Sequence, residues 1–191
     1  MTSFTPASAT AARAVPVKLT VNGEPHSLDV EARRSLADVL RRELRLTGTT
    51  VGCETGVCGS CTVLLDDEPV RACAMLAAQA DGGRVETVES LAPEGGELGP
   101  LQSAFRDNFA LQCGFCTPGF LMLATGLLRR EPDPDRAAVR ACVSANLCRC
   151  TGYQPIVDAV SAAAAVASAS GSAAASDSAD AAAGASTGEG S

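Results

Sequence analysis

Apolar and polar residues alternate in two short stretches near the start of the chain, at residues 17–21 and 26–30. This period of two predicts two β-strands, and the Asn-Gly pair at 22–23 is a strong signal for a hairpin turn between them. A second hairpin is predicted over residues 61–73, around an acidic tip, and a last short strand over residues 84–90. These elements predict a small sheet.

Between the two hairpins the apolar residues change to a helical period. Residues 35–44 place Leu36, Val39, Leu40 and Leu44 on one face, which predicts an amphipathic helix. Ser35 is a good N-cap residue, and Asp38 three positions later completes a pattern similar to a capping box. A helix set among strands favours an α+β domain.

After residue 91 the helical period dominates. Residues 92–100 are rich in Gly, Pro and Glu and predict a linker. Four helices are expected beyond it, over residues 101–111, 118–130, 135–145 and 154–166.

The chain therefore divides into two small domains and three connecting or terminal segments. The last segment is rich in Ala, Ser and Gly and has too little apolar bulk to offset the entropy of ordering. The predicted boundaries are a flexible N-terminal tail at 1–14, an α+β domain at 15–91, the linker at 92–100, a helical domain at 101–166 and a disordered tail at 167–191.

Composition and net charge exclude several classes of function for this chain. The net charge of −7 argues against a nucleic-acid partner, which requires a basic face. The most apolar run, residues 120–128, is too short to span a membrane, and no secretory signal is evident at the N-terminus. A cytoplasmic location is expected. In a reducing compartment, nine cysteines indicate metal or redox chemistry.

Four of the cysteines form a first quartet, with the spacing C-x4-C-x2-C followed by one more cysteine. This spacing is typical of plant-type [2Fe–2S] ligation, and the glycines among these cysteines allow a tight loop around a small cluster. A structural zinc site is the alternative, although zinc motifs more often contain C-x2-C twice. The members of the first quartet are Cys53, Cys58, Cys61 and Cys73.

Four more cysteines form a second quartet. Cys113 and Cys116 precede the helix predicted at 118–130, and Cys148 and Cys150 precede the helix predicted at 154–166. Helix N-termini favour anionic partners, so two such ends aimed at one point would hold a second four-sulfur site. The ninth cysteine, Cys142, is expected to be a small buried apolar residue.

Three motifs then identify a family. The stretches GCETGVCGSCTVLLD…RAC, ALQCGFCTPGF and SANLCRCTGYQPIV occur in this order. Together they resemble the small iron–sulfur subunit of the molybdenum hydroxylases, the group that includes xanthine dehydrogenase, aldehyde oxidoreductase and aerobic carbon monoxide dehydrogenase. The resemblance covers residues 15 to 160. It implies a β-grasp ferredoxin-like domain followed by a four-helix bundle, with one [2Fe–2S] cluster in each.

The resemblance also implies partners and roles. A large subunit would hold molybdopterin, a medium subunit would hold FAD, and the heterotrimer could pair into a dimer. The second quartet would lie nearer the pterin and the first nearer FAD. Gln112 and Cys150 match the residues closest to the pterin. One departure is Ala145, where the family usually has glycine; a methyl group is tolerable there if the backbone angle is ordinary.

The sequence thus predicts an electron-transfer subunit that passes electrons from molybdopterin to FAD and is not catalytic alone. No nucleotide-binding motif or catalytic constellation is evident. A free-standing two-cluster ferredoxin is the main alternative, and a zinc-stabilised adaptor is a third possibility. The substrate would be selected by the large subunit, so purines, other N-heterocycles, aldehydes, carbon monoxide and aromatic thioesters all stay open.

Overall fold

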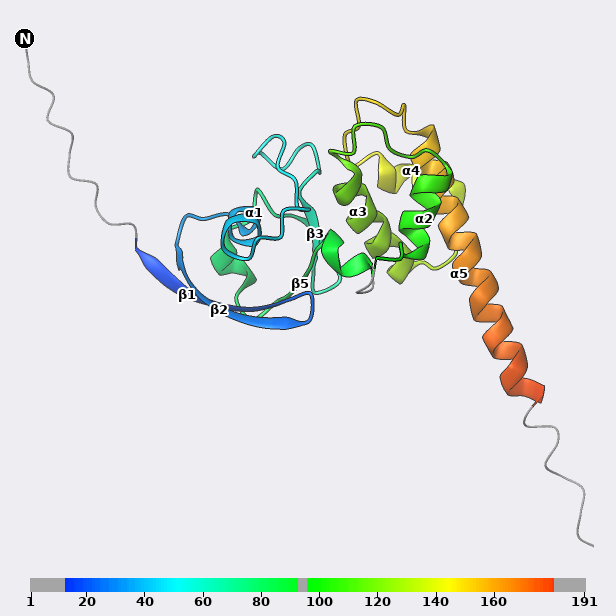
Figure 1. Cartoon of the computed structure of the whole chain (residues 1–191), viewed down its shortest axis with the longest axis horizontal. Coiled ribbons are helices and arrows are strands. Elements are labelled where there is room, and N and C mark those ends of the chain that lie inside the picture. The colour runs from blue at the N-terminus through cyan, green and yellow to red at the C-terminus, as the bar shows by residue number, and fades with distance from the viewer. Residues whose placement is uncertain (1–12, 93–95, 181–191) are drawn as a thin grey trace, which may run out of the picture.

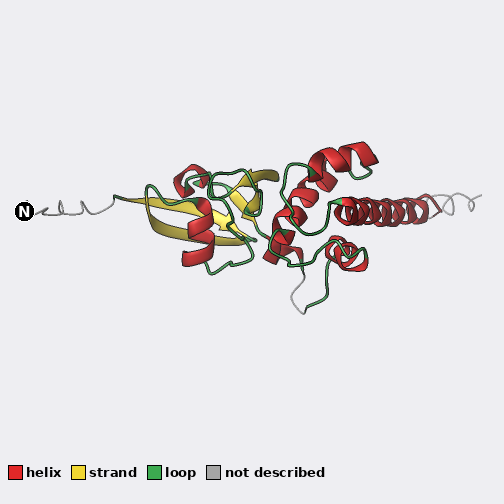
Figure 2. Cartoon of the chain, turned by 90° about the horizontal axis from the view of Figure 1, so that it is seen from above, coloured by secondary structure: helices red, strands yellow, loops and turns green. Residues whose placement is uncertain are grey.

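The computed structural model describes residues 13–92 and 96–180, with side chains described up to residue 167. The strands gather at the N-terminal end and the helices at the C-terminal end (Figure 1; Figure 2). We call residues 13–92 the sheet part and residues 96–180 the helical part. This arrangement confirms the predicted α+β class.

The predicted first hairpin is present. Strands β1 (Ala14–Val21) and β2 (Glu24–Glu31) pair antiparallel along their whole length. Asn22 and Gly23 make the turn with φ angles of 51° and 89°. Positive φ at both central residues is the geometry whose twist matches the flanking strands, and Asn-Gly adopts it at little cost.

Three further strands complete the sheet: β3 (Thr62–Leu65), β4 (Glu68–Arg71) and β5 (Arg84–Glu86). The strand order is β2-β1-β5-β3-β4, so the short β5 lies in the centre. It pairs parallel with β1 and antiparallel with β3.

Strand β5 is shorter than the prediction of 84–90. The strand ends because the Thr87 backbone N–H and hydroxyl bond to the Asn22 side chain, at 2.8 and 2.9 Å, in place of a ladder partner. A 3₁₀ turn, Val88–Leu91, follows.

The predicted helix at 35–44 consists of a short α-helical turn, α1 (Leu36–Asp38), that continues into a wider π-helical turn, Val39–Glu43. As expected, the Ser35 hydroxyl accepts a hydrogen bond from the Asp38 backbone N–H at 3.1 Å. Leu36 and Leu40 are fully buried against the sheet and form its core together with Val17 and Val85.

The helical part contains α2 (Pro100–Asp107), α3 (Thr117–Arg130), α4 (Arg136–Val143) and α5 (Gln154–Asp180). Their core is built around Phe105, Phe120, Val139 and Ile156. All four predicted helices are present. None of the helices within the described residues is long and apolar enough to cross a membrane.

Helix α5 differs from the prediction at its end. It continues to Asp180, beyond the boundary predicted at residue 166, and projects past the other helices (Figure 1). Alanine, the strongest helix former, is frequent in this stretch, so helix propensity alone favours continuation. Residues 181–191 of the predicted tail, and 1–12 at the other end, lie outside the described residues.

Helix α3 joins the two parts. It lies against β3 and β4, and a methyl group added at Gly126 would come within 2.7 Å of the Pro69 ring and 3.2 Å of Leu64. The Leu64 side chain of β3 is fully buried at this contact. The glycine therefore allows the helix backbone to approach the sheet closely.

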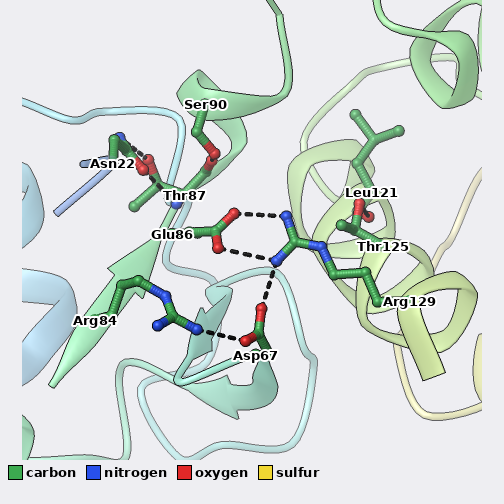
Figure 3. A network of polar contacts seen from close by, with 9 residues as sticks. All are labelled: Asn22, Asp67, Arg84, Glu86, Thr87, Ser90, Leu121, Thr125 and Arg129. Carbon is green, nitrogen blue, oxygen red and sulfur yellow. Dashed lines mark hydrogen bonds and ion pairs between the residues drawn. The ribbon is translucent and has the colours of Figure 1, made fainter.

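An ion-pair network closes this contact at the far end of α3 (Figure 3). Arg129 donates two hydrogen bonds to the Glu86 carboxylate, at 2.8 and 2.9 Å, and a third to Asp67 at 2.7 Å. Asp67 is also paired with Arg84. The forked guanidinium thus connects the helical part to both the β3–β4 turn and β5.

Replacement of Arg129 by methionine should lower the free energy of unfolding by about 1 kcal/mol, because the lost network is only partly shielded from water. Denaturant unfolding measures this change, and the loss should shrink in roughly 1 M salt, where charges are screened. The matched control is Arg106→Met, which breaks an exposed pair with the adjacent Asp107. An equal loss in both variants would contradict a role in joining the two parts.

Candidate iron–sulfur centres

The β3–β4 hairpin brings the first quartet together. Because Thr62 pairs with Arg71, Cys61 just before β3 and Cys73 just after β4 lie at the same end of the hairpin. The Cys73 backbone N–H points at the Cys61 sulfur at 3.4 Å. The hairpin predicted over residues 61–73 therefore brings Cys73 beside Cys61.

The other two members, Cys53 and Cys58, lie on the loop that precedes β3. The Cys53 sulfur accepts hydrogen bonds from the backbone N–H groups of Cys58, at 3.4 Å, and Thr55, at 3.5 Å. The Thr55 hydroxyl, followed by these N–H groups, lowers the pKa of Cys53 to about 5. Donors aimed at a sulfur favour the thiolate, which is the form that binds metal.

Cys73 behaves in the opposite way. Burial, followed by the neighbouring Cys61 sulfur, raises the pKa of Cys73 to about 12. The thiol must lose its proton to bind a metal, so metal binding at this site releases a proton and is favoured as the pH rises.

The second quartet gathers where two helices begin. Cys116 is the N-cap residue of α3, and Cys148 and Cys150 lie on the loop that leads into α5. The sulfur atoms of Cys113 and Cys150 are 3.6 Å apart. The two loops meet at one end of the helical part (Figure 1), as the sequence predicts.

Polar groups around Cys148 form hydrogen bonds to its sulfur and change its pKa. Burial raises the pKa of Cys148, but hydrogen bonds from the Thr151 hydroxyl and N–H outweigh it, so that the net effect is to lower this pKa. The Thr151 hydroxyl lies 3.1 Å from the Cys148 sulfur. Cys116 has its pKa raised to about 12 by burial and then by the adjacent Cys148.

Each quartet divides into two pairs of sulfurs. In the second quartet the sulfur atoms of Cys113 and Cys150 are in contact, and the adjacent Cys148 contributes to the raised pKa of Cys116. In the first, the Cys58 backbone N–H donates to the Cys53 sulfur and the Cys73 backbone N–H to the Cys61 sulfur, each at 3.4 Å. A tetrahedral metal with bonds of about 2.3 Å to sulfur holds two thiolates roughly 3.8 Å apart. The 3.6 Å between Cys113 and Cys150 matches that spacing.

This pairing fits a binuclear cluster, in which each of two irons takes two protein thiolates. The donor set of each quartet is therefore compatible with a [2Fe–2S] cluster.

The loops of the two quartets touch. Gly119, three residues after Cys116, packs against the Gly59–Ser60 backbone beside Cys58. A methyl group at Gly119 would come within 2.3 Å of the Gly59 carbonyl oxygen. Thr50 also donates a hydrogen bond to the Phe115 carbonyl at 2.8 Å. The two candidate centres are thus neighbours held by direct contacts.

The remaining predicted residues are placed as follows. Gln112 is exposed beside Cys113. Cys142, expected to be a small buried apolar residue, is half-buried against the helical core, with its thiol 3.8 Å from the Leu123 carbonyl oxygen. Ala145 is not among the residues with positive φ, so its methyl group is accommodated there.

Sequence reasoning missed the residues that support Cys148. The Tyr153 hydroxyl accepts a hydrogen bond from the Cys148 backbone N–H at 3.0 Å, and its ring packs edge-on against Phe120. Thr151 and Tyr153 both lie within five positions of Cys148. Their nearness to the C-x-C pair was the available signal, but spacing alone does not show which way a side chain points.

Comparison with known protein families matches the two parts separately. Residues 19–91 match the family described as a 2Fe-2S iron-sulfur cluster binding domain, and residues 87–161 match the [2Fe-2S] binding domain family. The chain is therefore a protein with two [2Fe–2S] domains.

Similar proteins identify the family. The chain is 59% identical over 140 residues to the beta subunit of the 6-hydroxypseudooxynicotine dehydrogenase complex of Paenarthrobacter nicotinovorans, covering 73% of this chain and 87% of that one. It is 54% identical over 146 residues to the nicotine 6-hydroxylase small subunit of the same organism, covering 76% and 87%. It belongs to the family of small iron–sulfur subunits of the molybdenum hydroxylases.

A solved structure agrees with this assignment. A chain of quinoline 2-oxidoreductase from Pseudomonas putida 86 superimposes with a TM-score of 0.78 at 50% sequence identity. The match covers 81% of this chain and 96% of that one.

Replacement of Gly119 by alanine tests the contact between the loops. In an ordinary helix this change would stabilise by up to about 1 kcal/mol. Here the clash with the Gly59 carbonyl should reverse the sign and cost about 1–3 kcal/mol, measured by thermal or denaturant unfolding. Thr125→Ala on the same helix is the control and should be close to neutral. A stabilised Gly119→Ala protein would refute the close approach.

Proposed function

We propose that this chain carries electrons, one at a time, between molybdopterin on a large partner subunit and FAD on a medium partner subunit. The observation that carries the proposal is the presence of two complete cysteine quartets whose loops touch within one chain. Two neighbouring redox sites can pass an electron from one partner to another, whereas a single site would only accept and store an electron. The family membership supports the same role.

We assign the eight cysteines as cluster ligands in the observed pairs. Cys53 and Cys58 would share one iron, and Cys61 and Cys73 the other. In the second centre the pairs are Cys113 with Cys150 and Cys116 with Cys148. When bound, [2Fe–2S] clusters supply one-electron chemistry.

The chain's own groups tune these sites. Backbone N–H groups of Thr55, Cys58 and Thr151 are directed at ligand sulfurs. Such donors stabilise the negative charge that accumulates on the sulfurs, and more so when an electron is added, so they favour the reduced state.

We further propose the architecture and boundaries that the family implies. Residues 15–91 correspond to a β-grasp ferredoxin-like domain, 92–100 to a linker and 101–166 to a four-helix bundle. The mixed sheet with β5 in its centre, and the four helices around Phe120, support this description.

The second centre faces outward. Cys113 and Cys150 are its exposed pair, whereas Cys116 and Cys148 are half-buried. Large apolar side chains close in sequence to these cysteines are exposed, including Phe109 at 82%, Leu147 at 54% and Phe115 at 50%. An exposed apolar group around a redox site is suited to a permanent partner. We propose that the large subunit docks here and that Gln112 and Cys150 approach the pterin.

We propose that the assembly is a heterotrimer that can pair into a dimer of heterotrimers, and that it is located in the cytoplasm. Nicotine and quinoline occur in the names of the relatives reported above. An N-heterocyclic substrate, bound by the large subunit, is therefore our proposed substrate class for the complex.

Iron analysis and electron paramagnetic resonance of the dithionite-reduced protein test the two centres. We expect about four irons and four acid-labile sulfides per chain, with two distinct [2Fe–2S] signals of equal spin. Cys148→Ser should remove or alter only one signal, because Cys148 belongs only to the second quartet.

Cys142→Ser is the matched control, since it removes a thiol from outside both quartets, and both signals should persist. Loss of both signals in Cys148→Ser, or no change in either, would refute the ligand assignment. Zinc in place of iron would favour the adaptor function. A soluble monomer that is fully loaded and reduces diverse partners would favour the free-standing ferredoxin.

Replacement of Phe109 by asparagine tests the docking edge. Phe109 has a φ of 53°, a conformation that asparagine adopts readily, so the change should leave the fold intact. Loss of an aromatic side chain that the large subunit would cover should weaken co-purification and binding of the large subunit by about tenfold, measured by titration. Leu98→Asn, at a residue 44% exposed before α2, is the control and should bind normally. Unchanged affinity for Phe109→Asn would exclude this edge.

A further inference from the structure

Three consecutive residues of the helical part, 145–147, each form a hydrogen bond with the sheet part. Together they bind the loop of the first quartet and the end of strand β4. The bonds run from Arg71 Nη2 to the Ala145 carbonyl (2.7 Å), from Asn146 Nδ2 to the Gly59 carbonyl (3.2 Å), and from the Leu147 backbone N–H to the Cys58 carbonyl (2.8 Å).

Asn146 is the central member and is fully buried. Its amide nitrogen bonds to Gly59, while its amide oxygen has no partner among the described residues. A buried polar group with an unmet hydrogen bond carries a free-energy cost, so packing alone does not account for an asparagine here. An apolar residue of similar size would avoid that cost but could not bond to Gly59.

The absence of a side chain at Gly59 leaves room for the Asn146 amide. Its φ is 76°, and a methyl group there would lie 1.9 Å from the Asn146 amide oxygen. Its carbonyl oxygen also accepts hydrogen bonds from the Thr62 backbone N–H (3.1 Å) and hydroxyl (2.6 Å). Gly59 therefore has both a backbone angle and a free space that only glycine provides.

The positions of these bonds along the chain are the significant feature. Cys58 and Gly59 belong to the loop of the first quartet, and Asn146 and Leu147 directly precede Cys148 of the second. Both loops are therefore fixed by groups within two residues of a cluster ligand. A shift of the 145–147 segment would move Cys148 relative to Cys58.

We propose that Asn146 is a positioning residue that sets the separation and relative orientation of the two iron–sulfur centres, with Arg71 and Leu147 as its supporting contacts. This inference rests on the proposed function, because it matters only if both quartets hold clusters. Electron transfer between two centres falls steeply with their separation, so a rigid link made at the ligands themselves would keep the relay fast.

Hydrogen exchange in the purified, cluster-loaded complex tests the link without depending on electron transfer. In Asn146→Ala the amide of Leu147, followed in a peptide over residues 144–150, should exchange at least about tenfold faster than in the unaltered chain. Asn22→Ala is the matched control. It removes a half-buried amide that bonds to Thr87 within the sheet part.

Electron paramagnetic resonance of the fully reduced protein tests the positioning. Two reduced clusters held at one distance produce a defined spin–spin splitting at low temperature. Asn146→Ala should broaden or weaken this splitting while leaving both individual signals present, and Asn22→Ala should not change it. If the signals themselves are missing from the unaltered protein, the proposed function fails, whereas the exchange result stands independently.

Arg71→Gln is a second, milder variant in case Asn146→Ala does not fold. It removes the bonds from Arg71 to the Ala145 carbonyl and to the Thr62 hydroxyl without opening a buried space. It should change the exchange rate and the splitting in the same direction by a smaller factor. Unaltered splitting in both variants would overturn the proposal. So would equal effects in Asn22→Ala, because they would indicate a general loss of stability.

Discussion

Cys113 and Cys150 are 37 residues apart in the sequence, yet their sulfur atoms lie 3.6 Å apart. That distance is suited to two thiolates bound to one metal ion. The fold around both cysteine quartets depends on the need to hold sulfur atoms this close together. Thiolates at such distances repel one another, so the fold must hold them by packing and by N–H donors until metal is bound. The starts of α3 and α5, and the β3–β4 hairpin, provide that framework at the two centres.

The same framework keeps the two centres together. Helix α3 carries Cys116 at its start and Arg129 at its end, so one rigid element spans the contact between the two parts. Near Cys116, glycine lets the backbone approach the first quartet closely. Near Arg129, a carboxylate network closes the far side. The contact therefore combines close packing near the redox sites with more hydrated ion pairs away from them.

The two quartets differ in how far their cysteines are exposed to solvent. Cys113 and Cys150 of the second quartet are exposed and have exposed apolar residues near them in the sequence, while Cys61 of the first quartet is buried. The net charge of −7 keeps the remainder of the surface compatible with water. An electron-transfer subunit of a larger complex needs this combination, because its redox sites must meet partners while the rest of the chain stays soluble.

Sequence by itself determined most of the local structure and grouped eight cysteines into two candidate quartets. The Asn22-Gly23 turn and the Ser35 cap are local signals, and the cysteine spacing carries the chemistry of the site. The end of β5 was not predicted, because it depends on hydrogen bonds between Thr87 and Asn22, which is distant in the sequence. The length of α5 was not predicted, because the segment after residue 166 has little apolar bulk and its helix is favoured by alanine propensity. Only the tertiary structure decided which sulfurs pair and that Asn146 reaches Gly59. Those contacts join residues distant in sequence, and their geometry depends on how α3 packs against the sheet, which no local pattern encodes.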